Sequence, residues 1–232
     1  MKFIVPDSFQ HAIAEQRLLA EKVSIRDEPF RLTTVAGVDV AYSRRGKKAL
    51  AIAGIVCMEW GTFSPISYTW AIYPVSFPYL TGLLSYREVP ALFAALERLE
   101  LSPDLWMIDG AGIAHPRRIG LASHFGVLTN FVTIGVAKSH LVGVYDDPGN
   151  EKGSRSPLFY QEEHVGYVLR SRNGVKPLFI SPGHRISLEK SVELVLKACI
   201  KYRLPEPTRA AHQFVTQIRR KIAEEGWKND DY

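Results

Sequence analysis

The stretch that decides the fold is LWMIDGAGIAHPRRIGLASHFG, residues 105–126. Its first four residues are apolar, and this run is too short and too closely bounded by turn residues for a helix. We therefore predict a buried strand at 105–108. Asp109 then stands at the carboxyl end of that strand, where open α/β sheets bind their ligands. On this stretch alone, Asp109 as a turn residue in an ordinary strand-to-helix loop is slightly favoured.

The residues after Asp109 predict a glycine turn followed by a helix. Gly110 and Gly112 allow the backbone to turn sharply and a ligand to approach it closely. Pro116 is favoured at the first position of a helix, which we expect to run over residues 116–128. The order strand, acid, turn and helix is typical of a ligand site at the end of a sheet strand.

The patterns on both sides of this stretch predict an α/β fold with a mixed sheet flanked by helices. Asp7 or Ser8 caps a first helix. Three β-rich segments, at 35–42, 50–58 and 66–73, are separated by turns short enough for antiparallel hairpins. Beyond them helix and strand alternate, which predicts parallel strands joined by helical crossovers. The remaining predicted elements are a helix at 90–100, a strand at 131–136, weaker strands within 141–180, and helices at 188–202 and 208–224.

Length and composition fit one domain over residues 1–232, with the N-terminal helix and an elaboration around 141–180. Of the 232 residues 46% are hydrophobic, which is enough for a full core. The sequence has no apolar run long enough to cross a membrane and no leader pattern, so we expect a cytoplasmic protein. Cys57 and Cys199 lack metal-type spacing and are expected to be reduced core residues.

The charge balance favours a polyanionic partner. The net charge is +5, and lysine and arginine gather in five short clusters. A single cluster is more often a solvated face, but several of them beside aromatic loop residues suit a surface that follows phosphates and stacks bases. The clusters lie at 44–48, 117–118, 152–155, 170–172 and 219–221, and the aromatic residues are Phe77, Tyr79, Tyr86 and Tyr160.

Two further acids stand where a carboxylate needs an explanation. Asp39 interrupts the apolar run TVAGVDVAY, and a buried charge is costly unless a metal ion, a donor network or an arginine satisfies it. Glu88 has the spacing of a capping box with Ser85. Because Pro90 is best placed as the first residue of a helix, we favour Glu88 as a ligand just before that helix over Glu88 as a cap.

The three carboxylates of Asp39, Glu88 and Asp109 predict a metal-dependent reaction. Without thiolates or a paired histidine motif, they describe a hard-oxygen site suited to Mg²⁺, with Mn²⁺ as a substitute. Two such ions can bind a phosphate and stabilise both the attacking water and the leaving oxygen. Hydrolysis of a phosphodiester bond is the reaction that this chemistry fits best.

Five blocks of the sequence resemble, in order, the signature blocks of the endonuclease V family of deoxyinosine-directed repair nucleases. The resemblance implies an RNase H-like fold, in which three hairpin strands precede parallel strands. It also implies incision at the second phosphodiester bond 3′ of inosine, leaving 3′-hydroxyl and 5′-phosphate ends. The blocks are VAGVDVAYS (35–43), PYLTGLLSYRE (78–88), DGAGIAHPRRIGLASHFG (109–126), IGVAKSHLVG (134–143) and PEPTRAAH (205–212).

The resemblance also assigns a catalytic set. Asp39, Glu88 and Asp109 match the family's metal-binding carboxylates, Lys138 matches a cation near the scissile phosphate or attacking water, and His212 matches a residue close to the metal. Without the resemblance, Lys138 would be an exposed lysine at a strand end, and His212 a surface or core histidine.

Pro78, Tyr79, Leu80 and Thr81 match the family's wedge, a loop that inserts at the lesion and fills the gap left by the displaced base. Thr81 stands where the bacterial pattern has proline. The ring of Tyr79 can replace lost stacking, and flipping a base costs only a few kcal/mol. The alternative is a plain turn with an exposed tyrosine.

The resemblance further implies a pocket for the flipped hypoxanthine. Gly82, Leu84, Gly110 and Gly112 are expected to surround the base and to read it through backbone groups. His115 precedes a predicted helix start, so it is expected to line this pocket or contact a phosphate, with helix capping as the alternative.

Two other functions remain open at this point. The chain could be another RNase H-like nuclease without selectivity for inosine, or a non-catalytic reader of inosine-containing RNA or DNA. Three carboxylates count against a reader, which has no need to gather negative charge beside a phosphate. We expect a monomer that acts on DNA containing deoxyinosine, and inosine-containing RNA stays open as a partner.

Overall fold

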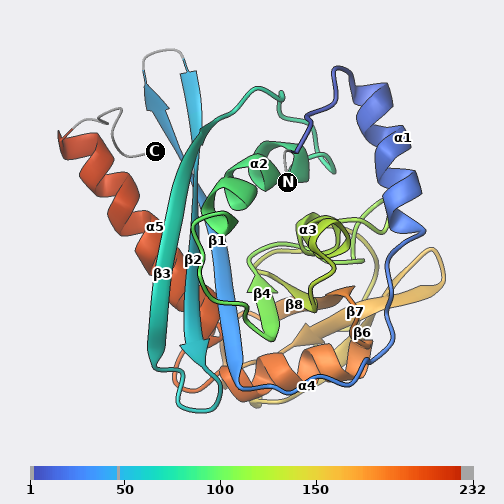
Figure 1. Ribbon diagram of the computed structural model, residues 1–232. Coiled ribbons are helices and arrows are strands. Elements are labelled where there is room, and N and C mark those ends of the chain that lie inside the picture. The colour runs from blue at the N-terminus through green and yellow to red at the C-terminus, as the bar shows by residue number, and fades with distance from the viewer. Residues whose placement is uncertain (1–2, 46–47, 226–232) are drawn as a thin grey trace.

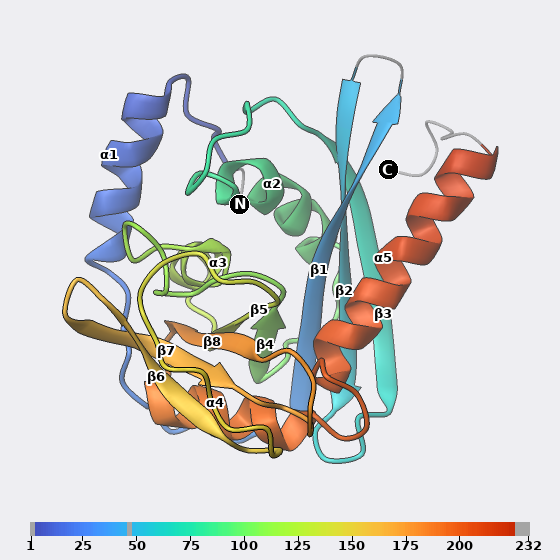
Figure 2. The same cartoon turned by 180° about the vertical axis from the view of Figure 1, so that it is seen from behind.

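The computed structural model describes residues 3–45 and 48–225, which build an eight-stranded sheet with helices on both faces (Figure 1). The strand order is β3-β2-β1-β4-β5-β8-β7-β6. Helices α2 and α3 cover one face, and α4 and α5 the other (Figure 2). The elements are α1 (Phe9–Ala20), β1 (Thr34–Arg45), β2 (Lys48–Glu59), β3 (Pro65–Pro74), α2 (Ser85–Leu96), β4 (Leu105–Ile108), α3 (Leu121–Thr129), β5 (Thr133–Ala137), β6 (Arg155–Tyr160), β7 (Glu163–Leu169), β8 (Leu178–His184), α4 (Leu188–Ala198) and α5 (Glu206–Glu225).

The strand pairing confirms the predicted RNase H-like mixed sheet. Strands β1, β2 and β3 are joined as antiparallel hairpins. Strand β4 then pairs parallel to β1, and β5 parallel to β4. The weaker strands expected within 141–180 are β6, β7 and the start of β8, which extend the sheet in antiparallel fashion beyond β5. The three parallel strands therefore end at the same edge of the sheet.

The short strand β4 separates the two layers of the core. All four of its residues are buried, as predicted. Leu105 and Met107 pack in the layer of α4 and α5, whereas Trp106 and Ile108 pack in the layer of α2 and α3. Because both faces of the sheet are covered, apolar residues are needed at successive positions and the strand has no polar side.

Helix α5 lies close against β1 because a glycine lets the two backbones meet. A Cβ atom at Gly37 would fall 1.9 Å from the carbonyl oxygen of Pro207, so a larger residue there requires the helix to move. The helix crosses β1 and β2 on the face opposite to α2 (Figure 2). This contact fixes the position of His212, which lies in the first half of α5.

Helix α2 begins at Ser85, so the predicted start at Pro90 is wrong. Pro90 lies inside the helix, and Glu88 lies in its first turn. Leu83 and Tyr86 are buried together against α1, and this packing outweighs the backbone hydrogen bond that Pro90 cannot donate.

Helix α3 begins at Leu121, so the predicted start at Pro116 is also wrong. Arg118 has a φ of 60°, which a continuous right-handed helix cannot contain. The amides of Gly120 and Ala122 donate to carbonyls in the glycine turn after β4, at 2.9 and 3.0 Å. The chain therefore folds back on that turn before the helix starts.

Other predicted features agree with the structure. Ser8 caps α1 by accepting a hydrogen bond from the amide of His11 at 3.1 Å. Cys57 and Cys199 are buried free cysteines. Within the described part of the chain, no helix is long and apolar enough to cross a membrane.

His124 joins α3 to α2 inside the core. It is fully buried, and its Nδ1 lies 2.8 Å from the hydroxyl oxygen of Ser85. The rings of Phe3 and Tyr86 pack against it edge to face. Burial, with a contribution from nearby His115, lowers the pKa of His124 to about 3, so the ring is neutral in the folded protein.

We expect the replacement His124→Gln to weaken the acid destabilisation of the protein. A histidine in the unfolded chain binds a proton near pH 6.5, whereas folded His124 does so only near pH 3. The neutral ring therefore stabilises the fold above pH 6.5, and this contribution is lost as the pH falls toward 3. Each proton taken up on unfolding changes the free energy of unfolding by about 1.4 kcal/mol per pH unit.

Denaturant unfolding between about pH 7 and pH 5 checks this prediction, because the slope of stability against pH should fall by about one proton in the variant. His11→Gln, at an exposed histidine, is the matched control. Equal slopes in the wild type and His124→Gln would contradict the prediction.

Candidate active site

Two aspartates meet at the sheet edge where the parallel strands end. Val38 on β1 is level with Ile108 on β4, so the residues that follow them, Asp39 and Asp109, lie side by side. The amide of Asp109 donates to the carbonyl of Val38 at 2.9 Å, which extends the pairing by one residue. The Asp39 side chain is 11% exposed and that of Asp109 15% exposed, so both carboxylates are largely removed from water.

Lys138 and His212 lie against these two carboxylates. Lys138, directly after β5, forms an ion pair with Asp109, and its Nζ is 3.5 Å from Nδ1 of His212. His212 on α5 places Nδ1 2.7 Å from Oδ2 of Asp39. Because an ionised carboxylate only accepts, Nδ1 carries a hydrogen and donates it to Asp39. One possible ligand atom each from Asp39, Asp109 and His212 lie within 4.8 Å of one another.

Glu88 on α2 lies near enough to Asp39 and Asp109 for their charges to act on its carboxyl. Its side chain is buried, and its Oε1 accepts a hydrogen bond from the hydroxyl of Tyr42 at 3.0 Å. Burial raises the pKa of the Glu88 carboxyl to about 8; the Tyr42 hydrogen bond opposes this shift, and the charges of Asp39 and Asp109 add to it. No side chain caps the start of α2, so the alternative role of Glu88 in a capping box is excluded.

The acidic cluster, which we define as Asp39, Glu88 and Asp109, holds more negative charge than Lys138 alone can balance. Burial raises the pKa of Asp109 to about 6, the charge of Asp39 adds to the shift, and Lys138 opposes it. Carboxylates that share a buried site keep a proton unless a cation takes its place. The carboxylate oxygens, with the imidazole of His212 beside them, are ligand atoms that suit Mg²⁺ or Mn²⁺. The residues present therefore fit a divalent metal ion.

A small cavity, which we call the side pocket, opens next to the acidic cluster. Gly110 in its wall follows Asp109 directly, and Ser85 in its wall begins the helix that carries Glu88. Its volume is about 120 Å³, the share of roughly four water molecules, and mostly apolar groups surround it. The lining residues are Tyr79, Leu80, Thr81, Gly82, Leu84, Ser85, Gly110, Ala111, His115, Gly120, Leu121 and Leu141.

Three donors hold the Gly82 carbonyl in the wall of the side pocket. The donors are Gln16 Nε2 and His115 Nε2, both at 3.0 Å, and Arg117 Nη2 at 2.7 Å. Burial lowers the pKa of His115 to about 4, with the charge of Arg117 adding to the shift, so the ring is neutral. Its Nδ1 accepts from the Arg117 amide at 3.2 Å, which leaves the hydrogen on Nε2. Helix α1, which carries Gln16, is thereby tied to the pocket wall.

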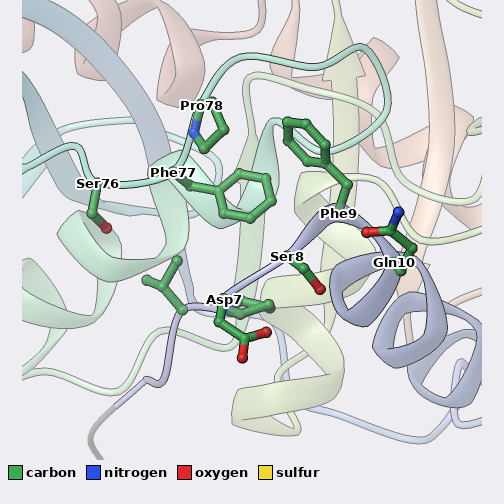
Figure 3. A pocket seen from close by; sticks show the side chains of 9 residues that line it. Asp7, Ser8, Phe9, Gln10, Ser76, Phe77 and Pro78 are labelled. Carbon is green, nitrogen blue, oxygen red and sulfur yellow. The ribbon is translucent and has the colours of Figure 1, made fainter.

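Gly112, expected in the base pocket, and Pro78, expected in the wedge loop, do not line the side pocket. A Cβ at Gly112 would fall 2.0 Å from the carbonyl oxygen of Pro182, so this glycine serves close packing against β8 and faces no ligand. Pro78 lines a separate open cavity of about 530 Å³ between residues 5–10 and 76–78. The rings of Phe9 and Phe77 meet edge to face in its wall (Figure 3).

Some arginines of the expected phosphate-tracking surface are used inside the fold. Arg170 is buried and donates to backbone carbonyls, among them that of Gly149 at 3.1 Å. Arg117 donates to the Gly82 carbonyl. The cluster at 44–48 lies partly outside the described residues.

Tyr42 and Arg87 belong to the site although the sequence did not single them out. Tyr42 lies three residues after Asp39 on β1, so the two side chains point to opposite faces of the sheet. Tyr42 packs in the α2 layer, and only the position of α2 brings its hydroxyl to Glu88. The guanidinium carbon of Arg87 lies 5.3 Å from the ring centre of Tyr42 and 5.8 Å from that of Tyr79. The one available signal was the position of Arg87 immediately before Glu88.

Comparison with known proteins gives the family of the chain. Residues 17–213 match the family model of endonuclease V. An endonuclease V of Nostoc punctiforme is 45% identical over 214 residues, which cover 91% of this chain and 95% of the relative.

Solved structures agree with this match. The crystal structure of endonuclease V from Streptomyces avermitilis superposes with a TM-score of 0.88 at 40% identity, covering 94% of this chain and 96% of the other. An endonuclease V of Ciona intestinalis, solved with a 23mer DNA that contains an inosine followed by a ribo-adenosine, has a TM-score of 0.83 at 29% identity and covers 94% and 100% of the two chains. With sequence and structure in agreement over nearly the whole chain, the protein belongs to the endonuclease V family and is a nuclease that hydrolyses phosphodiester bonds.

Proposed function

We propose that this protein is a metal-dependent endonuclease that recognises deoxyinosine, the product of adenine deamination, and incises the strand on its 3′ side. It hydrolyses the second phosphodiester bond 3′ of the lesion and leaves 3′-hydroxyl and 5′-phosphate ends. One observation carries the proposal: the side pocket adjoins the acidic cluster, so a base bound in the pocket places a nearby phosphate beside the carboxylates. The Ciona intestinalis complex with inosine-containing DNA supports the choice of base.

Asp39, Glu88 and Asp109 would hold a divalent cation, Mg²⁺ with Mn²⁺ as a substitute. When bound, the cation supplies the positive charge that binds the scissile phosphate and stabilises the charge developing on it. Asp39 and Asp109 contribute from two strands, and Glu88 contributes from α2. The raised pKa values of Glu88 and Asp109 support this role, because protons take the place of a cation in the free cluster.

Lys138 and His212 act on the reacting groups. The Lys138 ammonium, held by Asp109, contacts an oxygen of the scissile phosphate. His212 donates from Nδ1 to Asp39, which leaves the lone pair on Nε2 free. Because half of this side chain is exposed, Nε2 can accept the proton of the attacking water. The water attacks phosphorus in line with the departing 3′-oxygen.

The side pocket takes the hypoxanthine base. Gly82, Leu84 and Gly110 line it, and we expect N1–H and O6 of the base to be read by backbone groups there. Adenine carries an amino group in place of O6, and a donor that faces O6 would then lose its partner. The neutral ring of His115 and the guanidinium of Arg117 keep the Gly82 carbonyl in place while the base enters.

The wedge loop, residues 78–81, holds the strand open. Tyr79 is 70% exposed, so its ring is free to stack where the base has left the helix. Thr81 lines the side pocket next to Tyr79. We expect the protein to act as a monomer.

Incision of four matched labelled strands tests the proposal. The strands are DNA and RNA, each with or without one inosine, incubated with Mg²⁺ and mapped to the nucleotide. We expect a cut one nucleotide beyond inosine in DNA, and cutting of RNA would extend the substrate range. Selective binding without any cut under Mg²⁺ or Mn²⁺ would indicate a non-catalytic reader, and cutting that ignores inosine would indicate a different RNase H-like nuclease.

Asp109→Asn and Asp39→Asn should each reduce incision by more than the roughly 100-fold typical of an outer-shell loss, because each removes a charge that holds the cation. Thermal unfolding should show that both variants fold, since each amide keeps the shape of the carboxyl that it replaces. Glu193→Gln, at an exposed acid on α4, is the matched control and should retain full activity. Near-normal incision by either aspartate variant would show that the replaced residue is not a ligand of the cation.

Tyr79→Ala should bind an inosine-containing strand about 5- to 150-fold more weakly, which corresponds to the roughly 1–3 kcal/mol of one base–aromatic stack. Tyr79→Phe keeps the ring and should bind like the wild type. Fluorescence anisotropy with labelled strands measures the affinity, and calorimetry with Mn²⁺ checks that both variants keep the cation site. Equal affinity of Tyr79→Ala and the wild type would reject the wedge role.

A further inference from the structure

The hydroxyl of Tyr42 contacts a carboxylate that the proposed reaction requires. It donates to Oε1 of Glu88 at 3.0 Å, across the boundary between β1 and α2. Burial and the Glu88 charge raise the pKa of the Tyr42 hydroxyl, so it remains a neutral donor. Glu88 stands outside the group formed by Asp39, Asp109 and His212, whose possible ligand atoms lie within 4.8 Å of one another. Its carboxylate must therefore be held in one orientation if it is to join them at a shared cation.

Arg87 links Tyr42 to the loop that carries the wedge. Its guanidinium carbon lies 5.3 Å from the ring centre of Tyr42 and 5.8 Å from that of Tyr79, within the range of cation–π contacts. Its Nη1 also donates to the carbonyl of Phe77 at 2.9 Å, immediately before the wedge loop. The guanidinium thus contacts the ring of Tyr42 on one side and the chain that presents Tyr79 on the other.

We propose that Tyr42 is a positioning residue: its hydroxyl fixes the Glu88 carboxylate for cation binding, and Arg87 holds the Tyr42 ring in place against the wedge loop. This inference rests on the proposed function, because it takes Glu88 to be a cation ligand. Carboxylate ligands in metal sites are themselves held by hydrogen bonds, and removal of such a partner weakens metal binding about 10- to 100-fold. Tyr42 acts through Glu88 and contacts neither the phosphate nor the base.

The replacement Tyr42→Phe tests the inference because it removes the hydroxyl and keeps the ring on which Arg87 stacks. Cation affinity is measured by titrating the full-length, metal-free protein with MnCl₂ in a calorimeter. The concentration of free Mn²⁺, measured from its electron paramagnetic resonance signal, gives a second determination. We expect the dissociation constant to rise about tenfold or more. Incision of the inosine-containing strand should need more Mn²⁺ for half-maximal rate, and the rate at saturating Mn²⁺ should stay within about twofold of the wild type.

Tyr167→Phe is the matched control. The Tyr167 hydroxyl also donates to a glutamate, Glu189 at 3.3 Å, but this pair joins β7 to α4 away from the acidic cluster. Its loss should leave Mn²⁺ affinity unchanged. In a Glu88→Ala background, which lacks the acceptor of this hydrogen bond, the further change Tyr42→Phe should have no added effect on Mn²⁺ affinity.

The outcomes separate the inference from the proposed function. If the wild type binds Mn²⁺ and Tyr42→Phe binds it equally well, the positioning role of Tyr42 is overturned and the proposed function stands. An effect of Tyr42→Phe that persists in the Glu88→Ala background would also overturn it, since the hydroxyl would then act elsewhere. If the wild type fails to bind Mn²⁺, the proposed metal dependence fails, and the inference fails with it.

Discussion

The structure depends on holding three carboxylates together in a largely buried site. Asp39 and Asp109 are level on neighbouring parallel strands, and Glu88 faces them from α2. Such an arrangement is unfavourable by itself, because burial and mutual repulsion both oppose ionisation. The raised pKa values of Glu88 and Asp109 record this cost. The ion pair of Lys138 with Asp109 reduces this cost, and so do the hydrogen bonds of Tyr42 to Glu88 and of His212 to Asp39. A divalent cation would remove most of the remaining cost.

The supports of the acidic cluster come from both faces of the sheet. Helix α5 brings His212 to Asp39 from one face, and this approach requires the absence of a side chain at Gly37, where Pro207 touches β1. Helix α2 brings Glu88 from the other face, and Tyr42 meets it there. The sheet presents Asp39 and Asp109 at one edge. Two helices that pack on opposite faces of the sheet, α5 and α2, complete the site there with His212 and Glu88.

In the proposed function, base recognition and catalysis use the same two segments of chain. Gly82 in the pocket wall is followed within six residues by Glu88, and Gly110 follows Asp109 directly. The Gly82 carbonyl is held by donors from α1 and from the loop before α3, so the pocket wall is fixed to the body of the protein. In the proposed function, a base that entered the side pocket would meet a wall whose ends lead into the carboxylates, and this would set the distance between the base and the cleaved bond.

The sequence by itself determined the strands, the mixed sheet and the three carboxylates, because apolar runs and strand alternation are local and an acid in a buried run has few explanations. It misplaced the starts of α2 and α3, since the helix preferences of Pro90 and Pro116 yielded to tertiary packing. Only the tertiary structure decided that Gly112 packs on Pro182 and that Tyr42 reaches Glu88. These contacts join residues far apart in the chain, and no local pattern encodes which helix face will meet which strand.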